Sequence, residues 1–315
     1  MVYSMRQKTF KNLDEQIEIL KSRGLVINDV DKAKDILLRE NYFFLSGYRH
    51  LFNRSWKDIN FIPGTTFEEL YSVFIFDRKL RNIFFQNLLI VENNIKSLIS
   101  YQLSKKYGFR EKEYLDPKNY SRDPMKIRQV KDVLNKVKRQ IRLNGKQHTA
   151  TMHYITNYGY IPLWILVKVL SFGILSELYS ILDVSDQIDI ANFYNLDPET
   201  LSIYLTILSN YRNLCAHEDI LYDHRTQKSI PDTKYHRRLE IEMTDNEYNY
   251  GKNDLFSVII IMKQMLTEGE FRDFLKEICY EIEYLEGKIE VIPISNILNK
   301  IGFPKNYRDI MDIEK

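Results

Sequence analysis

The sequence contains few residues of the types that stabilise small or turn-rich folds. Its 315 residues include two cysteines, Cys215 and Cys279, too few for a disulfide scaffold or a four-cysteine zinc site. Glycine (11) and proline (8) are also scarce, which disfavours a β-sandwich with many turns and favours long helices. Because so little cysteine is typical of a reducing compartment, we expect a cytoplasmic protein.

Long apolar runs are missing as well. The longest, residues 160–175, contains Pro162 and Lys168 and is too short and too interrupted to span a bilayer. The first fifteen residues lack the apolar core of a signal peptide. We therefore expect a soluble protein with no membrane partner.

Charge is nearly balanced over the whole chain but unevenly distributed along it. The sequence has 45 basic and 43 acidic residues, a net charge of +2, which indicates no class of partner. Residues 122–148, however, hold nine basic residues and two acids, whereas residues 268–290 are acidic. The middle of the chain is therefore predicted to present a basic surface.

Apolar residues recur every three or four positions through most of the chain, which is the period of an amphipathic helix. The predicted helices cover residues 13–23, a segment capped by Asp29, and residues 67–106, 124–143, 162–182, 185–195, 198–216, 254–266 and 271–284. Residues 239–243 alternate and predict a short strand. The predicted fold class is mainly α, with an N-terminal helical region at 1–62, a core at 63–225 and a small C-terminal helical extension at 226–315.

The longest predicted helix begins near Phe67. Thr66 and Glu69 form a capping box, and apolar residues continue at helical spacing to about Lys106. A helix of this length spans ~60 Å at about 1.5 Å per residue. We therefore expect a kink, a break, or a dimer that uses the length.

The predicted helix 124–143 is amphipathic with a basic outer face. Its apolar stripe is flanked by the exposed basic residues Lys131, Lys138, Arg139 and Arg142. Such a face binds the phosphates of RNA independently of sequence, and nearby tyrosines suit stacking on unpaired bases. The alternative is a face that is merely solvated.

One short segment, NYRNLCAH at residues 210–217, combines side chains that suit work on a phosphate. It lies at the C-terminal end of the predicted helix 198–216, where Asn213 and His217 share a face and Arg212 borders the same groove. Arg212 supplies a planar cationic donor, and His217 supplies an imidazole, the side chain best suited to exchange a proton. On spacing alone, a C-terminal histidine near the last carbonyls and an arginine in a salt bridge remain the commoner interpretation.

RNA cleavage without a metal requires these groups. A 2′-hydroxyl loses a proton and attacks the adjacent phosphorus, and the leaving 5′-oxygen gains a proton, which leaves a 2′,3′-cyclic phosphate. One histidine cannot easily act both as the base for the 2′-hydroxyl and as the acid for the leaving 5′-oxygen. We therefore expect a homodimer with two Arg212/His217 pairs facing one cleft. The sequence shows no glycine-rich phosphate loop and no convincing metal-ligand spacing among its six histidines, so neither a metal nor another cofactor is expected.

At this motif the sequence resembles the HEPN superfamily, whose hallmark is Arg-x4–6-His. More narrowly, it is similar to the abortive-infection (AbiD/AbiF-type) HEPN proteins of bacterial phage defence. The similarity follows the chain in order through Asn41-Tyr42-Phe43-x-Leu45-Ser46-Gly47-Tyr48, Phe76-Asp77-Arg78-x-Leu80-Arg81, Pro162-x-Trp164, Arg212-Asn213-x-Cys215-Ala216-His217 and Gly302-Phe303-Pro304. At Lys168 an acid is expected in many relatives, which leaves that position without an assigned role.

The resemblance implies an all-α HEPN-type helical bundle that dimerises and cleaves RNA as a toxin restrained until infection. Arg212, His217 and Asn213 match the catalytic block. Some relatives pair with a small RNA that restrains them, so an RNA partner is also implied.

Three further residues are candidates for a supporting role. Arg78 and Arg81 are neighbours on the long helix and suit contacts with RNA phosphates, although pairing with Asp77 or Glu92 is an equal alternative. Glu92 is a candidate for orienting Arg212 or His217, or for an interhelical salt bridge.

Two other functions compete with the endoribonuclease. The first is a non-catalytic helical dimer that binds a structured small RNA or a partner protein through the basic helix. The second is a HEPN toxin silenced by adenylylation, which usually needs a tyrosine two residues after the histidine. That position is Asp219 here, and the nearest downstream tyrosine is Tyr222, which disfavours this scheme.

Overall fold

The computed structural model describes residues 9–55, 57–145 and 147–315, and over these residues the chain is mainly α-helical, as predicted. The only sheet in the described part has two short antiparallel strands. The chain packs into two compact units, one of residues up to Leu80 with 276–300, and one of residues 81–275 with 301–315. The division at residues 62 and 225 stays a prediction.

The first unit is built from the N-terminal helices. Its elements are α1 (Leu13–Ser22), α2 (Val30–Glu40), α3 (Tyr42–Ser46), the 3₁₀ helix η1 (Gly47–Phe52), and the parts within it of α4 (Phe67–Tyr107), α14 (Glu268–Glu286) and α15 (Ile294–Ile301). The predicted caps are present: Asp29 accepts a hydrogen bond from the Lys32 amide, and Thr66 and Glu69 form a capping box. These bonds satisfy amides that a helix start leaves open.

Helix α4 continues for 41 residues without a break in its helical conformation. The expected helix is confirmed almost to the residue, and a break, one of the outcomes considered for this length, does not occur. The sequence between Phe67 and Tyr107 contains neither glycine nor proline, the commonest causes of an interruption. Gly108 follows with a φ of 94°, which a glycine adopts at little cost, and the helix ends there.

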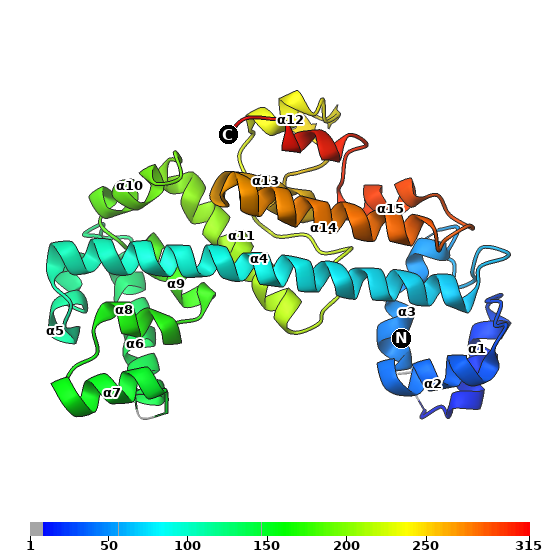
Figure 1. The fold of residues 1–315 in the computed structure, drawn as a ribbon, viewed down its shortest axis with the longest axis horizontal. Helices are drawn as coiled ribbons and strands as arrows, with labels where there is room; N and C mark the ends of the chain where they lie inside the picture. Colours follow the sequence, from blue (N-terminus) through cyan, green and yellow to red (C-terminus); the bar gives the residue numbers. More distant parts are fainter. Residues whose placement is uncertain (1–8, 56, 146) are drawn as a thin grey trace, which may run out of the picture. The chain divides into compact units, whose positions relative to one another are not determined.

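The second unit contains most of the remaining elements (Figure 1). They are α5 (Glu111–Tyr114), the 3₁₀ helix η2 (Pro117–Asn119), α6 (Ile127–Asn144), α7 (Thr149–Tyr158), α8 (Leu163–Leu166), the 3₁₀ helix η3 (Val167–Val169), α9 (Phe172–Ser180), α10 (Val184–Asn192), α11 (Pro198–Ala216), α12 (Lys234–Arg238), β1 (Met243–Thr244), β2 (Glu247–Tyr248), α13 (Leu255–Met265) and the 3₁₀ helix η4 (Tyr307–Met311).

The core of the second unit forms around α11. This helix packs against α9, α10 and α13. Helix α13 consists mostly of apolar residues and is buried along almost its whole length, as expected for a helix in the middle of a core. The surrounding helices therefore hold the last turn of α11 on a rigid support.

Two predicted elements have different boundaries in the structure. The helix expected at 162–182 is interrupted after Leu170, because the Ser171 side chain accepts a hydrogen bond from the Ile174 amide and starts α9 as a new helix. The strand expected at 239–243 is absent over most of that range. Leu239 instead ends α12, and Glu240 has a φ of 49°, which is incompatible with a strand.

Among the described residues, no helix has both the length and the apolar character needed to cross a membrane.

Candidate functional site

The predicted helix 198–216 is α11, and its last turn is held by a defined C-terminal motif. The His217 amide donates to the Asn213 carbonyl at 3.0 Å, and the Asp219 amide donates to the Leu214 carbonyl at 3.3 Å. Glu218 lies between them with a left-handed φ of 56°, a conformation usually occupied by glycine. The motif keeps Asn213 and His217 at helical spacing while the chain turns away.

Arg212 is anchored from behind by a buried acid. Its Nε donates to Oε2 of Glu92 on α4 at 3.1 Å, and Glu92 is only 3% exposed. The guanidinium carbon also lies 5.5 Å from the centre of the Phe85 ring, in cation–π contact. The terminal amino groups of Arg212 have no hydrogen-bond partner among the described residues, so they remain available to an anion.

The charge at this position is not neutralised by Glu92. Lys96, one turn along α4, donates to the other carboxylate oxygen of Glu92 at 2.7 Å. One carboxylate therefore serves two cations, and the group as a whole carries a net positive charge. Such a place favours a further anion, and a phosphate is one that fits a guanidinium.

His217 and Asn213 are both exposed, whereas the neighbouring Leu214 and Cys215 are buried. Cys215 therefore belongs to the apolar side of α11, as expected. The last turn thus presents a half-buried guanidinium, an amide and an accessible imidazole to solvent. This set can hold an anion and move a proton.

Arg81, predicted as a supporting residue, lies in the second unit and contacts the chain just after His217. It is 3% exposed, and its guanidinium donates to the backbone carbonyl of Asp219 at 3.3 Å. Arg81 thus positions the turn that follows the helix rather than reaching into solvent. A buried arginine used in this way fixes backbone geometry.

Arg78, its neighbour in sequence, belongs to the first unit. It forms two hydrogen bonds with the carboxylate of Glu40 on α2, at 3.0 and 2.5 Å. This carboxylate was not among the partners considered from the sequence. The Arg78 guanidinium lowers the pKa of the Glu40 carboxyl, and the ion pair links α4 to α2.

The basic helix is α6, which starts three residues later than the predicted Pro124 and ends at Asn144. Its buried residues, Val130, Val133, Leu134 and Val137, face the second unit, and α6 packs on α9. The four predicted RNA-binding residues, Lys131, Lys138, Arg139 and Arg142, are all exposed. Lys146, which adds to the basic charge of the segment, lies outside the described residues.

The tyrosines nearest to this helix in the preceding segment are not available for stacking. Tyr114 and Tyr120 are 1% and 2% exposed, and their hydroxyls donate to backbone carbonyls. Exposed rings occur instead on α7, a helix that the sequence pattern did not reveal, where Tyr158 is 57% exposed and stacks obliquely on Tyr154. Helix α7 begins against the end of α6, since the Thr151 hydroxyl donates to the Asn144 carbonyl.

A second histidine lies on the same side of α11. A ring nitrogen of His224 is 2.6 Å from Oδ1 of Asn210, which precedes His217 by seven residues on one helix face. Burial lowers the pKa of His224 below its ordinary value. The sequence offered no signal for this contact, because His224 follows the helix in an irregular segment.

Among the described residues, no three metal-ligating side chains of the His, Cys, Asp or Glu type form a cluster.

Comparisons with known proteins identify the family. No curated protein and no solved structure matched the chain. A family model described as Abi-like protein matches residues 35–223, which cover more than half of the chain and include α6, α11 and the segment up to Asp223. The protein with Arg212 and His217 at the end of α11 therefore belongs to the Abi-like family of abortive-infection proteins.

Proposed function

We propose that the protein is a metal-independent endoribonuclease of the HEPN type that acts in abortive infection. Its site is the last turn of α11, with Arg212 and His217 as catalytic residues and Asn213 as a contact to the substrate. The observation that carries the proposal is the anchored Arg212: Glu92 holds its Nε at 3.1 Å while its terminal amino groups stay available, five residues before the exposed His217.

Each side chain has a defined task in this proposal. His217 takes the proton from a ribose 2′-hydroxyl, whose oxygen then bonds to the adjacent phosphorus. Arg212 stabilises the negative charge that develops on the phosphoryl oxygens, and Asn213 orients the phosphate by hydrogen bonding. The bond from phosphorus to the 5′-oxygen breaks, and the leaving oxygen takes up a proton. The products carry a 2′,3′-cyclic phosphate and a 5′-hydroxyl.

Two protons must move, and one exposed imidazole serves only one of these transfers at a time. A homodimer that brings two copies of the turn together supplies the second imidazole, so we propose that the active form is a dimer. The basic face of α6 attracts the RNA chain electrostatically. A small RNA bound to the same face is a further proposal for how the enzyme is restrained.

The test is cleavage of RNA in the presence of EDTA, followed by analysis of the product ends. We expect His217→Ala and Arg212→Ala to reduce cleavage at least about 1,000-fold, because each removes a group that acts in the transition state. His153→Ala is the matched control, since His153 is exposed on α7 of the same unit. Full cleavage by His217→Ala, or by a strictly monomeric protein, would contradict the proposed site.

A second function is favoured by the exposed basic face of α6. A non-catalytic dimer would hold a structured RNA there without cutting it. In that case wild-type protein and His217→Ala would bind RNA equally, and the RNA would stay intact with both. Recovery and sequencing of RNA bound to the wild-type protein distinguish this function from the nuclease.

A further inference from the structure

A row of aromatic rings extends from α8 to α7, two helices of the second unit that contact each other (Figure 1). It begins with Trp164 on α8 and Phe109 just before α5, whose ring centres are 5.5 Å apart. The Phe109 ring lies 5.7 Å from that of Tyr160, which lies 6.4 Å from that of Tyr158 at the end of α7. Tyr154 continues the row at 5.3 Å from Tyr158. These residues are called the aromatic row.

No residue of the aromatic row is buried. Tyr158 is 57% and Trp164 43% exposed, and the other three are partly exposed. Two aliphatic side chains of α7, Met152 and Ile155, are also exposed, by 48% and 39%. Exposed apolar surface gathered in one place is typical of a site that binds another molecule.

The backbone holds the aromatic row in place. Gly159 ends α7 with a φ of 75°, which glycine adopts without a steric penalty, and the chain turns there so that Tyr160 lies beside Tyr158. The next residue, Ile161, is buried, and its carbonyl accepts a hydrogen bond from the Tyr114 hydroxyl at 2.8 Å. Rings on such a fixed backbone lose little conformational freedom when a ligand binds.

Most of the aromatic row lies in a part of the sequence without acids. No aspartate or glutamate occurs between Asp132 and Glu177, whereas six lysines and arginines do. Helix α7 also begins against the end of the basic helix α6, where the Thr151 hydroxyl donates to the Asn144 carbonyl at 2.8 Å. The charge around the rings therefore favours an anionic partner.

One cation lies directly on the aromatic row. Arg110 is exposed, and its guanidinium carbon is 5.1 Å from the centre of the Tyr160 ring and 5.9 Å from that of Phe109. The two acids close to it in sequence, Glu111 and Glu113, each accept a hydrogen bond from a backbone amide. The row thus combines ring faces with a guanidinium, which is the combination that binds single-stranded nucleic acid.

We propose that the aromatic row binds unpaired bases of a single-stranded RNA. The bases stack on the exposed rings, Arg110 meets a phosphate, and the exposed lysines and arginines of α6 attract the rest of the strand. Every base has a face that stacks on a ring, so binding tolerates many sequences, whereas bases paired inside a duplex do not reach the rings. The inference rests on the proposed function in taking the polymer to be RNA, and it deepens that function by naming unpaired RNA as the substrate class.

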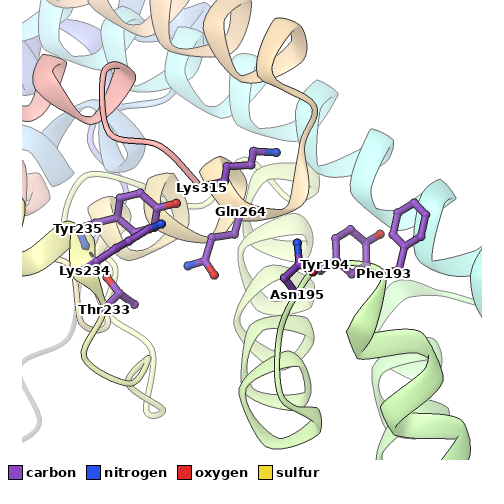
Figure 2. A pocket seen from close by; sticks show the side chains of 8 residues that line it. All are labelled: Phe193, Tyr194, Asn195, Thr233, Lys234, Tyr235, Gln264 and Lys315. Atoms are coloured by element: carbon purple, nitrogen blue, oxygen red, sulfur yellow. Dashed lines mark hydrogen bonds between the residues drawn. The ribbon is translucent and has the colours of Figure 1, made fainter.

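A second group of aromatic residues in the same unit supplies the control. Phe193, Tyr194 and Tyr235 line a cavity of about 480 Å³ (Figure 2). Both tyrosines are buried, so only Phe193, which is 65% exposed, presents a ring to solvent there. One isolated ring does not align successive bases, and Phe193→Ala is therefore the matched control for the loss of an exposed ring.

Binding is tested by titrating the full chain into a short, unstructured, labelled RNA and into the same RNA annealed to its complement. Both carry 2′-O-methyl groups, so that no 2′-hydroxyl can attack and the strands stay intact whichever residues are catalytic. We expect the single strand to bind at least about 10-fold more tightly than the duplex at equal salt. Tyr158→Ala with Trp164→Ala should weaken binding of the single strand about 10-fold or more, and Phe193→Ala should leave it unchanged.

Conservative variants and salt separate stacking from other causes. Tyr158→Phe with Trp164→Phe keeps both ring faces and should bind the single strand within about twofold of wild type. The alanine variant should lower the affinity without changing the slope of log affinity against log salt, because rings release no counterions. Equal binding of duplex and single strand, unchanged affinity in the alanine variant, or an equal loss in the phenylalanine variant would overturn the inference.

Failure of the proposed nuclease gives a different result. A protein that prefers the single strand through Tyr158 and Trp164, but never cleaves unmodified RNA, retains this binding surface and loses the catalytic proposal.

Discussion

Helices α11 and α6 both present polar residues to solvent, but in different ways. Helix α11 is buried over most of its length and exposes the residues of the proposed site only in the last turn, where Arg212 is hydrogen-bonded to Glu92. Helix α6 is buried on one side and carries exposed basic residues along the other. One helix holds a few groups at fixed positions, and the other spreads charge along a surface.

Under the proposed function, the difference corresponds to two kinds of interaction with a phosphodiester chain. Catalysis requires groups fixed to within a fraction of an ångström, which a rigid, buried helix and a buried carboxylate provide. Attraction of a polyanion requires only charge in the right region, and long solvated side chains provide that. Changes at the two helices should therefore affect different measurements.

Apart from changes to Arg212 and His217 themselves, the largest effect is expected at Glu92. Glu92→Ala leaves Arg212 and Lys96 without their shared carboxylate, so the guanidinium is no longer fixed. We expect cleavage to fall about 100-fold and the free energy of unfolding to fall by about 3 kcal/mol. RNA cleavage assays and urea unfolding measure these two quantities.

Asp132→Ala is the control for this change. Asp132 is an exposed acid on α6, and its ion pair with Arg128 has a separation of 4.0 Å. Its removal should change neither the rate of RNA cleavage nor the free energy of unfolding by a measurable amount. Normal cleavage by Glu92→Ala would show that Arg212 does not need its anchor.

The next effect is expected on α6. Replacing Lys138, Arg139 and Arg142 by alanine should weaken RNA binding and lower the slope of log affinity against log salt by about 2, at about 0.7 per lost phosphate contact. Cleavage at saturating RNA should remain near wild type. Titrations of labelled RNA at several salt concentrations measure the slope.

The matched control removes three exposed cations elsewhere in the second unit: Lys228, Arg237 and Arg272. If this variant lowers the salt slope as much as the α6 variant, the basic face of α6 has no special role and the contrast between the two helices fails.

A smaller effect concerns a histidine that is buried rather than exposed. His236 accepts a hydrogen bond from the Thr233 amide and bonds to the Gly251 carbonyl, and burial lowers its pKa. Below the ordinary value near 6.5, the unfolded chain binds a proton that the folded chain excludes. Stability should therefore fall as pH drops below 6.5, by up to about 1.4 kcal/mol per pH unit.

The comparison with His236→Gln isolates this contribution, because glutamine takes up no proton. Asp254, whose pKa burial raises to about 6, acts in the opposite direction but is the same in both proteins. Melting temperatures between pH 5 and 8 should show a flatter profile for the variant. An equally steep profile would contradict the assignment. In the test of the proposed nuclease, any pH dependence of cleavage is corrected for the stability profile that is found.

The smallest effect is expected at Glu218, which adopts a left-handed conformation at the end of α11. Glu218→Gly should stabilise the protein by about 0.5–1 kcal/mol, because glycine adopts this conformation without a steric penalty. Ala216→Gly is the control and should destabilise by a similar amount, since it places glycine within the helix. Urea unfolding measures the free energy of unfolding of both variants. Destabilisation by Glu218→Gly would show that the left-handed conformation of Glu218 carries no steric penalty.

The sequence by itself determined the helical fold class, most helix positions and the residues at the end of α11. Apolar periodicity and capping residues are local signals, and they identified α4 and α11 almost to the residue. The family resemblance, also read from the sequence, agrees with the match to the Abi-like model. Helix α7 was missed because no side chain caps its start, and the break before Ser171 was missed because the apolar run continues across it.

Only the tertiary structure decided which side chains meet. The pairing of Glu92 with Arg212 joins residues 120 positions apart, and that of Arg78 with Glu40 joins residues 38 apart. The aromatic row also combines separate segments, and the contact of His224 with Asn210 depends on the path of an irregular loop. No local spacing encodes such contacts, because they follow from how helices pack around a shared core. That packing determines which charges are buried, which remain accessible and where exposed rings meet.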